Sequence, residues 1–446
     1  MGGLLKKEER RKPKWEKYIG NVNWYLTRDK RKCKDILALS YTHLPRYLKP
    51  CFLYFRVYPE DTEISVRQLI QLWIAEGFID DTGDRILEDL SEDYLDELVD
   101  RSLIQVASRR TDGGIKTCRI HDLLRDLCIS ESAEDKFFEV RTNVKLLSTN
   151  RTRRLSVLGN TPLYISSNPS DPSRARSLLF FDQDILTCPR RSQDQHWNWV
   201  FENFKLVRML NLGHTVVPYS ISQGIEKLKY LRIATGAANV IPNSICNLWY
   251  LETLDVRRSN LACLPIGIWK LQRLRNLYML GPVHFPAPLD TDNKALNKLQ
   301  VLSTIQFDLK TATLMGQGKF PSVKKLGIYC SGIKCREWGF LPNLQHLSHL
   351  QTLKIVNFSW LPTNENSFPS TITKISLIYA GINNMKVLGS LPRLQILKPY
   401  KCTIYGILHV IADSFPGLEV FKLDNLKMEE WKQGRGAMPR LRHLIL

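Results

Sequence analysis

A pattern of apolar positions recurs through the second half of the chain. It has the form L-x-x-L-x-x-L-x-L, seen over 204–212, 248–256 and 271–279. A lone short strand cannot bury such leucines, so we expect successive coils to stack and share one core. The pattern predicts a leucine-rich-repeat solenoid with a curved parallel β-sheet, the horseshoe arrangement, over residues 141–446. The third apolar position of each copy, which recurs every 21 to 28 residues, is Leu210, Leu231, Leu254, Leu277, Ile305, Leu326, Leu353, Ile375, Leu397, Phe421 and Leu444.

The first third of the chain has a different pattern. Two weaker strand-like runs, around Leu155 and Leu178, precede the repeats, and before them residues 36–79 have helical spacing. We expect short helices there, interrupted at three prolines, and an amphipathic helix over 85–104. Two strand-like runs then flank 112–114, a hairpin signal. Helices followed by a hairpin predict a winged-helix domain over 35–140, so the fold class is α+β. The three prolines are Pro45, Pro50 and Pro59.

Length and composition limit the class of protein. Of 446 residues, 43% are hydrophobic, which is enough for an extensive core. No run reaches the roughly 20 apolar residues of a membrane span, and the N-terminus lacks a secretory signal. We therefore expect a cytoplasmic protein without an integral membrane segment. The ten cysteines include no C-x-x-C pair, so we expect reduced core thiols and no metal site.

The charge is unevenly distributed. The net charge is +19, which suits an acidic protein partner, an anionic membrane surface or nucleic acid. Residues 1–34 hold twelve basic and four acidic side chains, whereas residues 80–100 hold ten acidic side chains and one Arg. A solvated helical face explains most of the basic run, so we do not expect nucleic acid as a partner.

The winged-helix region contains three diagnostic stretches: "LSYTHLPRYLKPCFLYFRVYPED", "LIQLWIAEGFI" and "IHDLLRDL". Together with the repeats, they resemble the coiled-coil class of plant NB-ARC leucine-rich-repeat disease resistance proteins. The segment "GGLLKKEERRKPKWEKYI" is similar to the end of the helical subdomain that precedes the winged helix in that family. We therefore assign residues 1–34 to the tail of such a subdomain. The resemblance implies a role in plant innate immunity.

His121 and Asp122 stand side by side at the start of a helix-like run. A catalytic dyad would need a nucleophile or metal, and no motif supplies one. From the residues alone, Asp122 is a good helix N-cap and His121 packs against the preceding strand. The resemblance implies instead that His121 contacts the β-phosphate of ADP and that Asp122 fixes the turn, since an imidazole N–H is a good phosphate donor.

A complete nucleotide site is not expected in this sequence. The only P-loop-like run is "GQGK" at 316–319; a G-x-x-x-x-G-K-[ST] match would need Gly at Thr313 and Ser or Thr at Phe320. The family's P-loop precedes the winged helix, so we expect an N-terminally truncated member. We expect no cofactor in this chain, weak or absent ADP binding and no hydrolysis; ADP or ATP enters by resemblance only.

The outward positions of the repeat strands form the expected binding face. Exposed aromatic side chains beside basic ones are typical interface anchors. The resemblance implies two partners for such a face: a pathogen effector or guarded host protein, and the nucleotide-binding region, within the chain or between chains. The candidate partner-binding residues are Arg257, Arg258, Tyr278, Tyr329, Lys354, Lys398, Tyr400 and Lys422.

Three functions therefore compete. The leading one is a non-enzymatic recognition protein of plant immunity. The second is an ADP/ATP-dependent switch, which requires sequence upstream of Met1. The third is a DNA-binding winged-helix regulator; its recognition-helix candidate, 66–78, carries only one basic residue, Arg67, which argues against groove binding.

Overall fold

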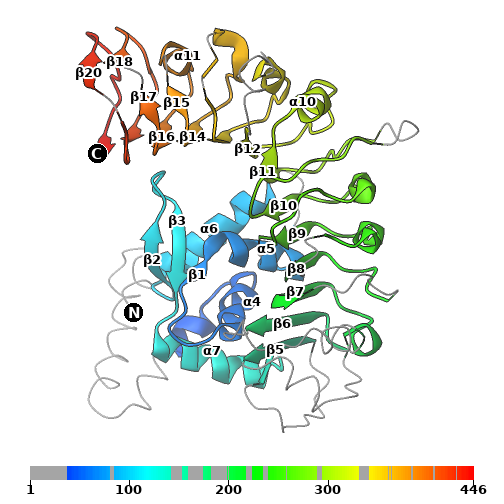
Figure 1. Ribbon diagram of the computed structural model, residues 1–446. Coiled ribbons are helices and arrows are strands. Elements are labelled where there is room, and N and C mark those ends of the chain that lie inside the picture. Colours follow the sequence, from blue (N-terminus) through cyan, green and yellow to red (C-terminus); the bar gives the residue numbers. More distant parts are fainter. Residues whose placement is uncertain are drawn as a thin grey trace, which may run out of the picture. The chain divides into compact units, whose positions relative to one another are not determined.

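The structure, a computed structural model, forms two compact units, residues 1–213 and 214–446 (Figure 1). The residues that it describes are 38–80, 85–141, 153–158, 174–181, most of 198–216, 224–234, 240–257, 259–288, 294–330, 341–359 and most of 361–445. The segment 1–34, assigned above to a helical subdomain, lies outside them, so that assignment stays a prediction.

The first unit opens with the helices of the winged-helix region. Aromatic side chains dominate its core: Phe52, Tyr54, Phe55 and Trp73 are completely buried. Pro50 lies in the first turn of α4, where a missing N–H breaks no helical hydrogen bond, so our expected interruption at Pro50 was wrong. The helices are α4 (Leu48–Leu53), the 3₁₀ turn η1 (Tyr54–Val57), α5 (Val66–Glu76), α6 (Leu87–Asp100) and α7 (Asp122–Glu134).

A small antiparallel sheet completes the winged helix. Its strands are β1 (Ile64–Ser65), β2 (Gln105–Arg109) and β3 (Ile115–Arg119), in the order β1-β3-β2. Gly113 turns the chain between β2 and β3 with a φ of 82°, which favours glycine, and the Arg110 N–H donates to the Gly114 carbonyl at 2.7 Å. The hairpin predicted at 112–114 is therefore confirmed.

The first repeat strands belong to the same unit. They are β4 (Glu139–Arg141), β5 (Arg154–Leu158), β6 (Ser177–Phe181) and the start of β7 (Met209–Val216), which pair in parallel in that order. Leu155, Leu178 and Leu210 are Cα partners across this ladder and are buried. The two weak strand-like runs therefore belong to the repeat array.

The second unit repeats one coil. Each coil contributes a short strand that pairs in parallel with its predecessor, and in all but the exposed last strand the inward residues join a continuous leucine core. This confirms the leucine-rich-repeat fold. The strands are β8 (Tyr230–Ala234), β9 (Thr253–Val256), β10 (Asn276–Met279), β11 (Val301–Gln306), β12 (Lys325–Tyr329), β13 (Thr352–Val356), β14 (Lys374–Ile378), β16 (Ile396–Tyr400), β19 (Val420–Lys422) and β21 (His443–Ile445).

One predicted repeat position was wrong. Leu302, rather than Ile305, pairs with both Leu277 and Leu326 in the ladder. The register then shifts within β11, so that Ile305 pairs with Ile328. Both Leu302 and Ile305 are apolar and buried, and the sequence spacing could not tell which one was in register.

Short helices and strand pairs form the other side of each coil, on the right in Figure 1 for the earlier coils of this unit. The helices are η2 (Asn243–Asn247), η3 (Ile266–Lys270), α10 (Leu309–Gly316), η5 (Leu341–His346), η6 (Glu365–Ser367) and α11 (Lys386–Gly389). Parallel pairs form between β15 (Gly381–Ile382) and β17 (Thr403–Ile404), and between β18 (Ile407–Val410) and β20 (Glu430–Gln433).

The described cysteines are all free thiols, and all but one are buried. The exception is Cys263, which is exposed. Our expectation that it is a core residue was therefore wrong. Cys33, Cys188 and Cys335 lie outside the described residues. A search of the described helices finds none that is both long and apolar enough to span a bilayer.

Candidate functional site

His121 is the N-cap of α7, and its side chain is exposed. Its backbone is extended at φ −73° and ψ 146°, and its Nδ1 accepts a hydrogen bond from the Leu123 N–H at 3.3 Å. The His121 carbonyl accepts from the N–H groups of Leu124 and Arg125. An Nδ1 that accepts leaves Nε2 as the protonated nitrogen of the neutral ring, so this tautomer presents one N–H donor to a ligand.

Asp122 does not have the role that we expected from the sequence. It is the first residue of α7, and its neighbour His121 makes the cap hydrogen bond. An imidazole in the N-cap position can accept from the next-but-one N–H in the way that an Asp carboxylate does. The exposed Asp122 carboxylate instead lies in the first turn, where a negative charge is favourable.

The recognition-helix candidate is buried. Eight of the eleven residues of α5 are buried, among them Leu72 and Trp73 at 0% exposure. A helix that reads DNA must offer a solvated face with polar and basic side chains. In this structure α5 offers no such face, which weighs against the DNA-binding alternative.

A buried ion pair joins the winged helix to the first repeat strands within the first unit. Arg154 Nε lies 2.8 Å from Glu76 Oε2, with the two side chains 17% and 4% exposed. The Ser177 hydroxyl also donates to Glu76. The guanidinium of Arg154 lies 4.9 Å and 4.4 Å from the ring centroids of Phe78 and Phe137. These contacts link α5, β5 and β6.

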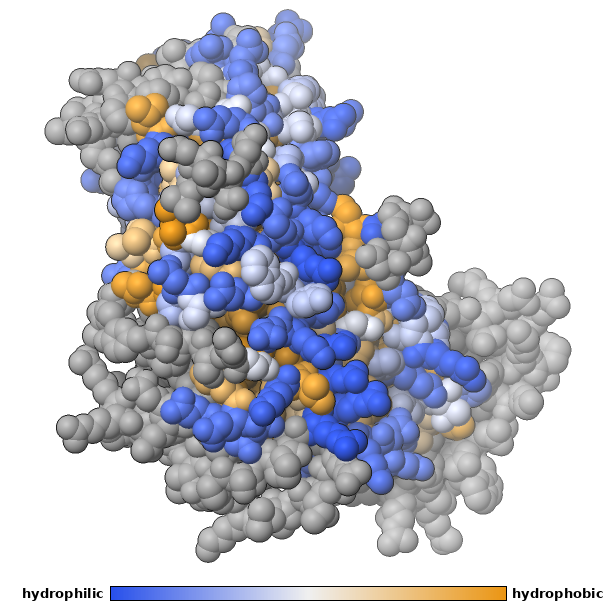
Figure 2. Space-filling model, turned by 90° about the vertical axis from the view of Figure 1, so that its right-hand side faces the viewer, coloured by the Kyte–Doolittle hydropathy of each residue, from blue (hydrophilic) through white to orange (hydrophobic). Residues whose placement is uncertain are grey.

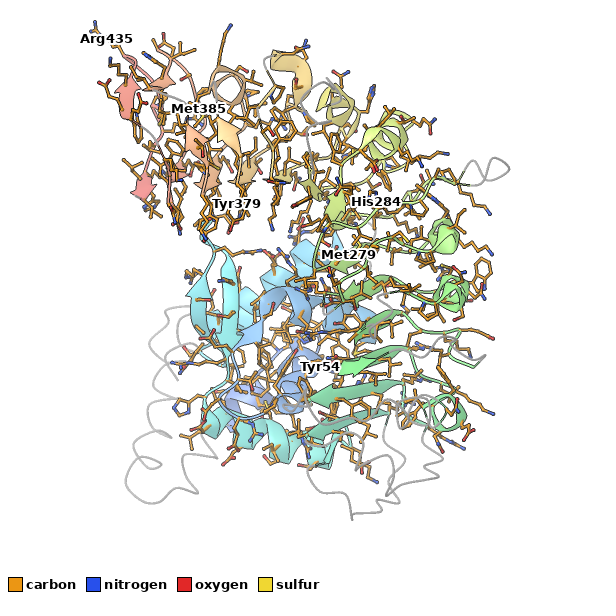
Figure 3. All side chains as sticks on the ribbon, in the orientation of Figure 1. Tyr54, Met279, His284, Tyr379, Met385 and Arg435 are labelled. Atoms are coloured by element: carbon orange, nitrogen blue, oxygen red, sulfur yellow. The ribbon has the colours of Figure 1, made fainter. Side chains whose placement is uncertain are left out.

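Further contacts surround this pair. The Ser156 hydroxyl donates to the Val57 carbonyl at 3.1 Å, and the ring centroids of Tyr58 and Phe181 are 5.3 Å apart. Tyr54, labelled in Figure 3, directs its hydroxyl to Met209 Sδ at 3.2 Å. Among the described residues, the winged helix and the first strands thus share one core.

The second unit carries a basic sheet face, which we call the lysine face. It consists of the outward lysines of β12, β13, β14, β16 and β19, whose neighbours in each strand point into the leucine core. Lys354 and Lys398 both align with Ser376 in the ladder, so their Cα atoms are two strands, about 10 Å, apart. The lysine face comprises Lys325, Lys354, Lys374, Lys398 and Lys422.

Three of the predicted partner-binding residues lie on this face, and two tyrosines border it. Lys354 is exposed, Lys398 and Lys422 are half-buried, and Lys422 Nζ lies 3.5 Å from Asp424 Oδ2. Tyr400 is 36% exposed at the end of β16. Tyr329, at the end of β12, is half-buried, and its hydroxyl accepts from Asn357 Nδ2 at 3.3 Å.

The other predicted partner-binding residues do not present exposed side chains in the way that we expected. The guanidinium of Arg257 binds the buried Asp255 carboxylate through Nε at 3.0 Å and Nη2 at 2.6 Å. It also lies 4.9 Å from the ring of Tyr278. Tyr278 is 3% exposed, so its predicted exposure was wrong; its ring packs under Arg257 and its hydroxyl faces Asn276. Arg258 lies outside the described residues.

Sequence reasoning missed a row of turn residues beside the lysine face. Three residues of this turn row directly follow the last residue of β13, β14 or β16, and the fourth follows Asp424, which pairs with Tyr400; all four have a φ of 50° to 56°, in the left-handed region. In three of them the backbone N–H donates to a carbonyl of the next coil: Asn357 to Ile378, Tyr379 to Tyr400 and Lys401 to Asp424. The left-handed backbone, which recurs from coil to coil, is the feature that distinguishes these residues. The members of the turn row are Asn357, Tyr379, Lys401 and Asn425.

Tyr379, Tyr400 and Lys401 form a cluster in and beside this row. Tyr379 lies just past the end of β14 (Figure 3) and is 54% exposed. Lys401 Nζ lies 5.7 Å from the ring centroid of Tyr379 and 5.2 Å from that of Tyr400. Hydrogen bonds to Tyr400 and, to a smaller extent, to Tyr379 raise the pKa of Lys401, so its ammonium stays charged at neutral pH.

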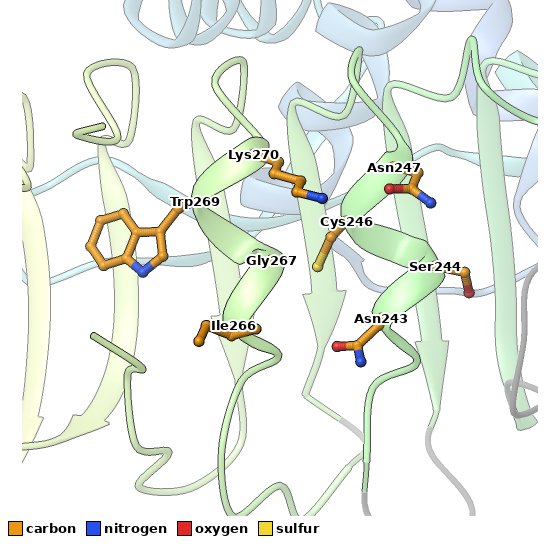
Figure 4. Close-up of a pocket in the computed structure, with 8 residues that line it drawn as sticks. All are labelled: Asn243, Ser244, Cys246, Asn247, Ile266, Gly267, Trp269 and Lys270. Atoms are coloured by element: carbon orange, nitrogen blue, oxygen red, sulfur yellow. The ribbon is translucent and has the colours of Figure 1, made fainter. Parts of the chain in front are cut away.

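A cleft of about 480 Å³ lies on the helical side, between η2 and η3. Cys246 and Lys270 point into the space between these helices (Figure 4). The helices can approach closely because Gly267 has no Cβ atom; a Cβ there would lie 2.9 Å from Cys246 Cβ. Burial raises the pKa of Cys246 to about 11, so its thiol is protonated at neutral pH. The cleft therefore offers no activated nucleophile.

The view of the structure from its helix-bearing side shows mainly hydrophilic residues, with small separate groups of hydrophobic ones (Figure 2). Within the described ranges, no cluster of three or more His, Cys, Asp or Glu side chains is placed to hold a metal ion. The lysine face with its turn row gathers basic side chains on one side of the sheet.

Family models match the two parts of the chain. The disease resistance protein winged helix domain matches residues 57–128, and a leucine-rich repeat region matches residues 175–379. These parts define a winged-helix protein with leucine-rich repeats, as the sequence patterns predicted.

Relatives match over the whole chain. It is 32% identical to a putative late blight resistance protein homolog, R1B-16 of Solanum demissum, with 100% of this chain and 35% of the relative covered. It is 29% identical to ToMV resistance protein Tm-2(2) of Solanum lycopersicum, with 100% and 56% covered. The chain is thus a homologue of plant disease resistance proteins. It spans between about a third and somewhat more than half of the length of these relatives.

Among solved structures, matches occur at low identity and low TM-score. A TDR receptor is 15% identical with a TM-score of 0.38, covering 66% of this chain and 55% of its own. The plant peptide hormone receptor RGFR1 in complex with RGF2 is 11% identical with a TM-score of 0.36, covering 66% and 58%.

Proposed function

We propose that this chain is a recognition component of plant disease resistance, in which the lysine face binds a pathogen-derived or guarded host protein. The observation that carries the proposal is homology to resistance proteins over the whole chain, combined with five outward lysines on one sheet face. Leucine-rich-repeat sheets are extended binding surfaces. The proposed role is recognition rather than catalysis, and the proposed compartment is the cytoplasm.

Charge complementarity supports a protein partner with an acidic surface. Lys354, Lys398 and Lys422 give the face a positive potential that would speed association with such a partner and select its orientation. Tyr329 and Tyr400 add rigid, partly exposed rings at the ends of two strands. Aromatic and charged groups side by side are common in the energetically important parts of interfaces.

The test is a leaf assay with a charge-reversal variant. The chain and its Lys354→Glu/Lys398→Glu variant would be expressed in leaf tissue that is then challenged with a panel of pathogens. We expect the unaltered chain to change cell death or pathogen growth for at least one pathogen, and the variant to lose that effect at equal protein level. No effect of the unaltered chain on any pathogen would contradict the proposal.

A second candidate, the nucleotide-dependent switch, has one supporting observation. His121 is exposed at the start of a thirteen-residue helix, with one ring N–H available to a phosphate. By resemblance, this N–H would contact the β-phosphate of ADP, with Asp122 beside it. For this chain alone we expect no rise in melting temperature with ADP. A rise at micromolar ADP that His121→Ala removes would favour the switch.

A further inference from the structure

The Tyr379, Lys401 and Tyr400 side chains form an exposed cluster at the edge of the lysine face. The two rings are 6.4 Å apart at an interplanar angle of 66°, with the Lys401 ammonium beside both. An ammonium next to aromatic rings keeps its charge and gains cation–π attraction. The ammonium and the two phenol hydroxyls are hydrogen-bond donors, so together they suit a carboxylate.

The backbone at Tyr379 and Lys401 is unfavourable for these residue types. Both have left-handed φ values, 52° and 50°, which are energetically unfavourable for a residue with a Cβ atom. The equivalent positions in the neighbouring coils hold Asn357 and Asn425, and asparagine tolerates this conformation better. Two neighbouring coils thus place an asparagine at this position, whereas these two coils place a tyrosine and a lysine there at a higher conformational cost.

The surroundings of the cluster indicate what it binds. Lys398 is two residues before Tyr400 on the same outward face of β16, and Lys422 is on the adjacent strand β19. On the other side of β16, the outward positions at the ends of β14 and β13 hold apolar Ile378 and Val356, which are half-buried. A run of lysines beside apolar positions and exposed rings fits a chain that carries both carboxylates and apolar side chains.

We propose that this cluster, with Lys398, is a docking site for an acidic polypeptide segment of a partner protein, whose carboxylate accepts hydrogen bonds from the Lys401 ammonium and from the Tyr379 and Tyr400 hydroxyls. This inference rests on the proposed function and specifies the chemistry of its partner. A nucleic acid fits less well, because the Asp424 carboxylate, 3.5 Å from Lys422 Nζ, would repel a phosphate backbone. A polypeptide can instead donate an N–H to Asp424.

The test measures binding of the full chain to labelled short peptides by fluorescence anisotropy. The probes are a polyglutamate peptide, a polylysine peptide of equal length and a single-stranded oligonucleotide. We expect polyglutamate to bind and polylysine not to bind. The double variant Tyr379→Asn/Lys401→Asn should weaken polyglutamate binding by about tenfold, and Lys401→Arg should keep most of it.

The matched control is Lys432→Gln, which removes one positive charge from β20, away from the lysine face. It should change polyglutamate binding by less than about twofold. Equal loss in the control, no loss in the double variant, or tighter binding of the oligonucleotide would overturn the docking site. Self-association of the unaltered chain that the double variant abolishes would also overturn it, because the occupant would then be a second copy.

Two further measurements distinguish lost binding from unfolding, and the docking site from the proposed function. The double variant should melt at the same temperature as the unaltered chain or higher, which excludes unfolding as the cause of lost binding. If the chain protects leaves but the double variant protects equally well, the docking site is wrong and the proposed function stands. If the cluster binds polyglutamate but the chain has no effect in leaves, the proposed function is wrong.

Discussion

Two cations in this protein each lie beside a pair of aromatic rings, one in each unit. Arg154 in the first unit lies beside Phe78 and Phe137, and its side chain is 17% exposed and paired with Glu76. Lys401 in the second unit lies beside Tyr379 and Tyr400 and is exposed. The first arrangement is internally complete, so it contributes to stability. The second has an unfavourable backbone and faces water, so it is available to a partner.

The largest effect is expected where the cation is buried. Arg154→Met leaves Glu76 buried without its partner, and we expect the free energy of unfolding to fall by about 3–4 kcal/mol. Urea unfolding followed by tryptophan fluorescence would measure it, with separate transitions fitted separately. The control is Arg85→Met, whose partner Asp93 is exposed; the expected loss is below about 1 kcal/mol. Equal losses would mean that burial does not distinguish the two pairs.

The next effect tests the repeat core. Leu254 and Leu444 occupy the same position of their coils but are 0% and 47% exposed. Leu254→Ala should lower the free energy of unfolding by about 3 kcal/mol, because it opens a cavity. Leu444→Ala should lower it by less than about 1 kcal/mol, since water already reaches that side chain. The same unfolding experiment compares them, and similar values would argue against a shared core.

A change of one pH unit is expected to have a smaller effect. Burial raises the pKa of the Cys118 thiol in β3 from 9.0 to about 12. A raised folded-state pKa gives stability that is complete below pH 9 and is lost between pH 9 and about pH 12, because the unfolded thiol ionises first. We expect a loss of about 1.4 kcal/mol per pH unit from this group. Cys118→Ala should reduce the slope of stability against pH in this window; an unchanged slope would contradict the assignment.

The smallest effect has the opposite sign. Tyr379→Asn should raise the free energy of unfolding by about 0.5–1 kcal/mol, because asparagine adopts the left-handed backbone at lower cost. A matched substitution is Asn425→Tyr in the same turn row, which should lower stability by a similar amount. Melting temperatures of both variants measure the difference. Destabilisation by Tyr379→Asn would show that the tyrosine ring supports the fold, and the contrast with Arg154 would weaken.

Much of the fold could be predicted because it follows from local periodicity. The leucine spacing predicted the repeat strands, including the weak ones at Leu155 and Leu178, and the glycine turn at 112–114 predicted the hairpin. The errors came where two apolar residues competed for one register, at Leu302 and Ile305, and where a short helix tolerated Pro50 in its first turn. Neither choice is visible in a pattern of apolar positions alone.

The candidate sites were less predictable from sequence. His121 and the outward lysines follow from motif and strand alternation, whereas the Arg257 and Tyr278 side chains turned out to be engaged by Asp255 and Asn276. Tyr379 and Lys401 were missed because their significance lies in a left-handed backbone at a turn. No residue type other than glycine signals that conformation reliably.

The sequence by itself determined the order of the winged helix and the repeats, because 3.6-residue and coil-length periodicities are local properties of the chain. It also carried the resemblance to plant disease resistance proteins, through stretches such as "IHDLLRDL". Only the tertiary structure decided which charged groups are satisfied internally. Whether a cation such as Arg154 or Lys401 meets a carboxylate, a ring or water depends on residues far away in the chain, which stacking of coils and packing of the winged helix bring together.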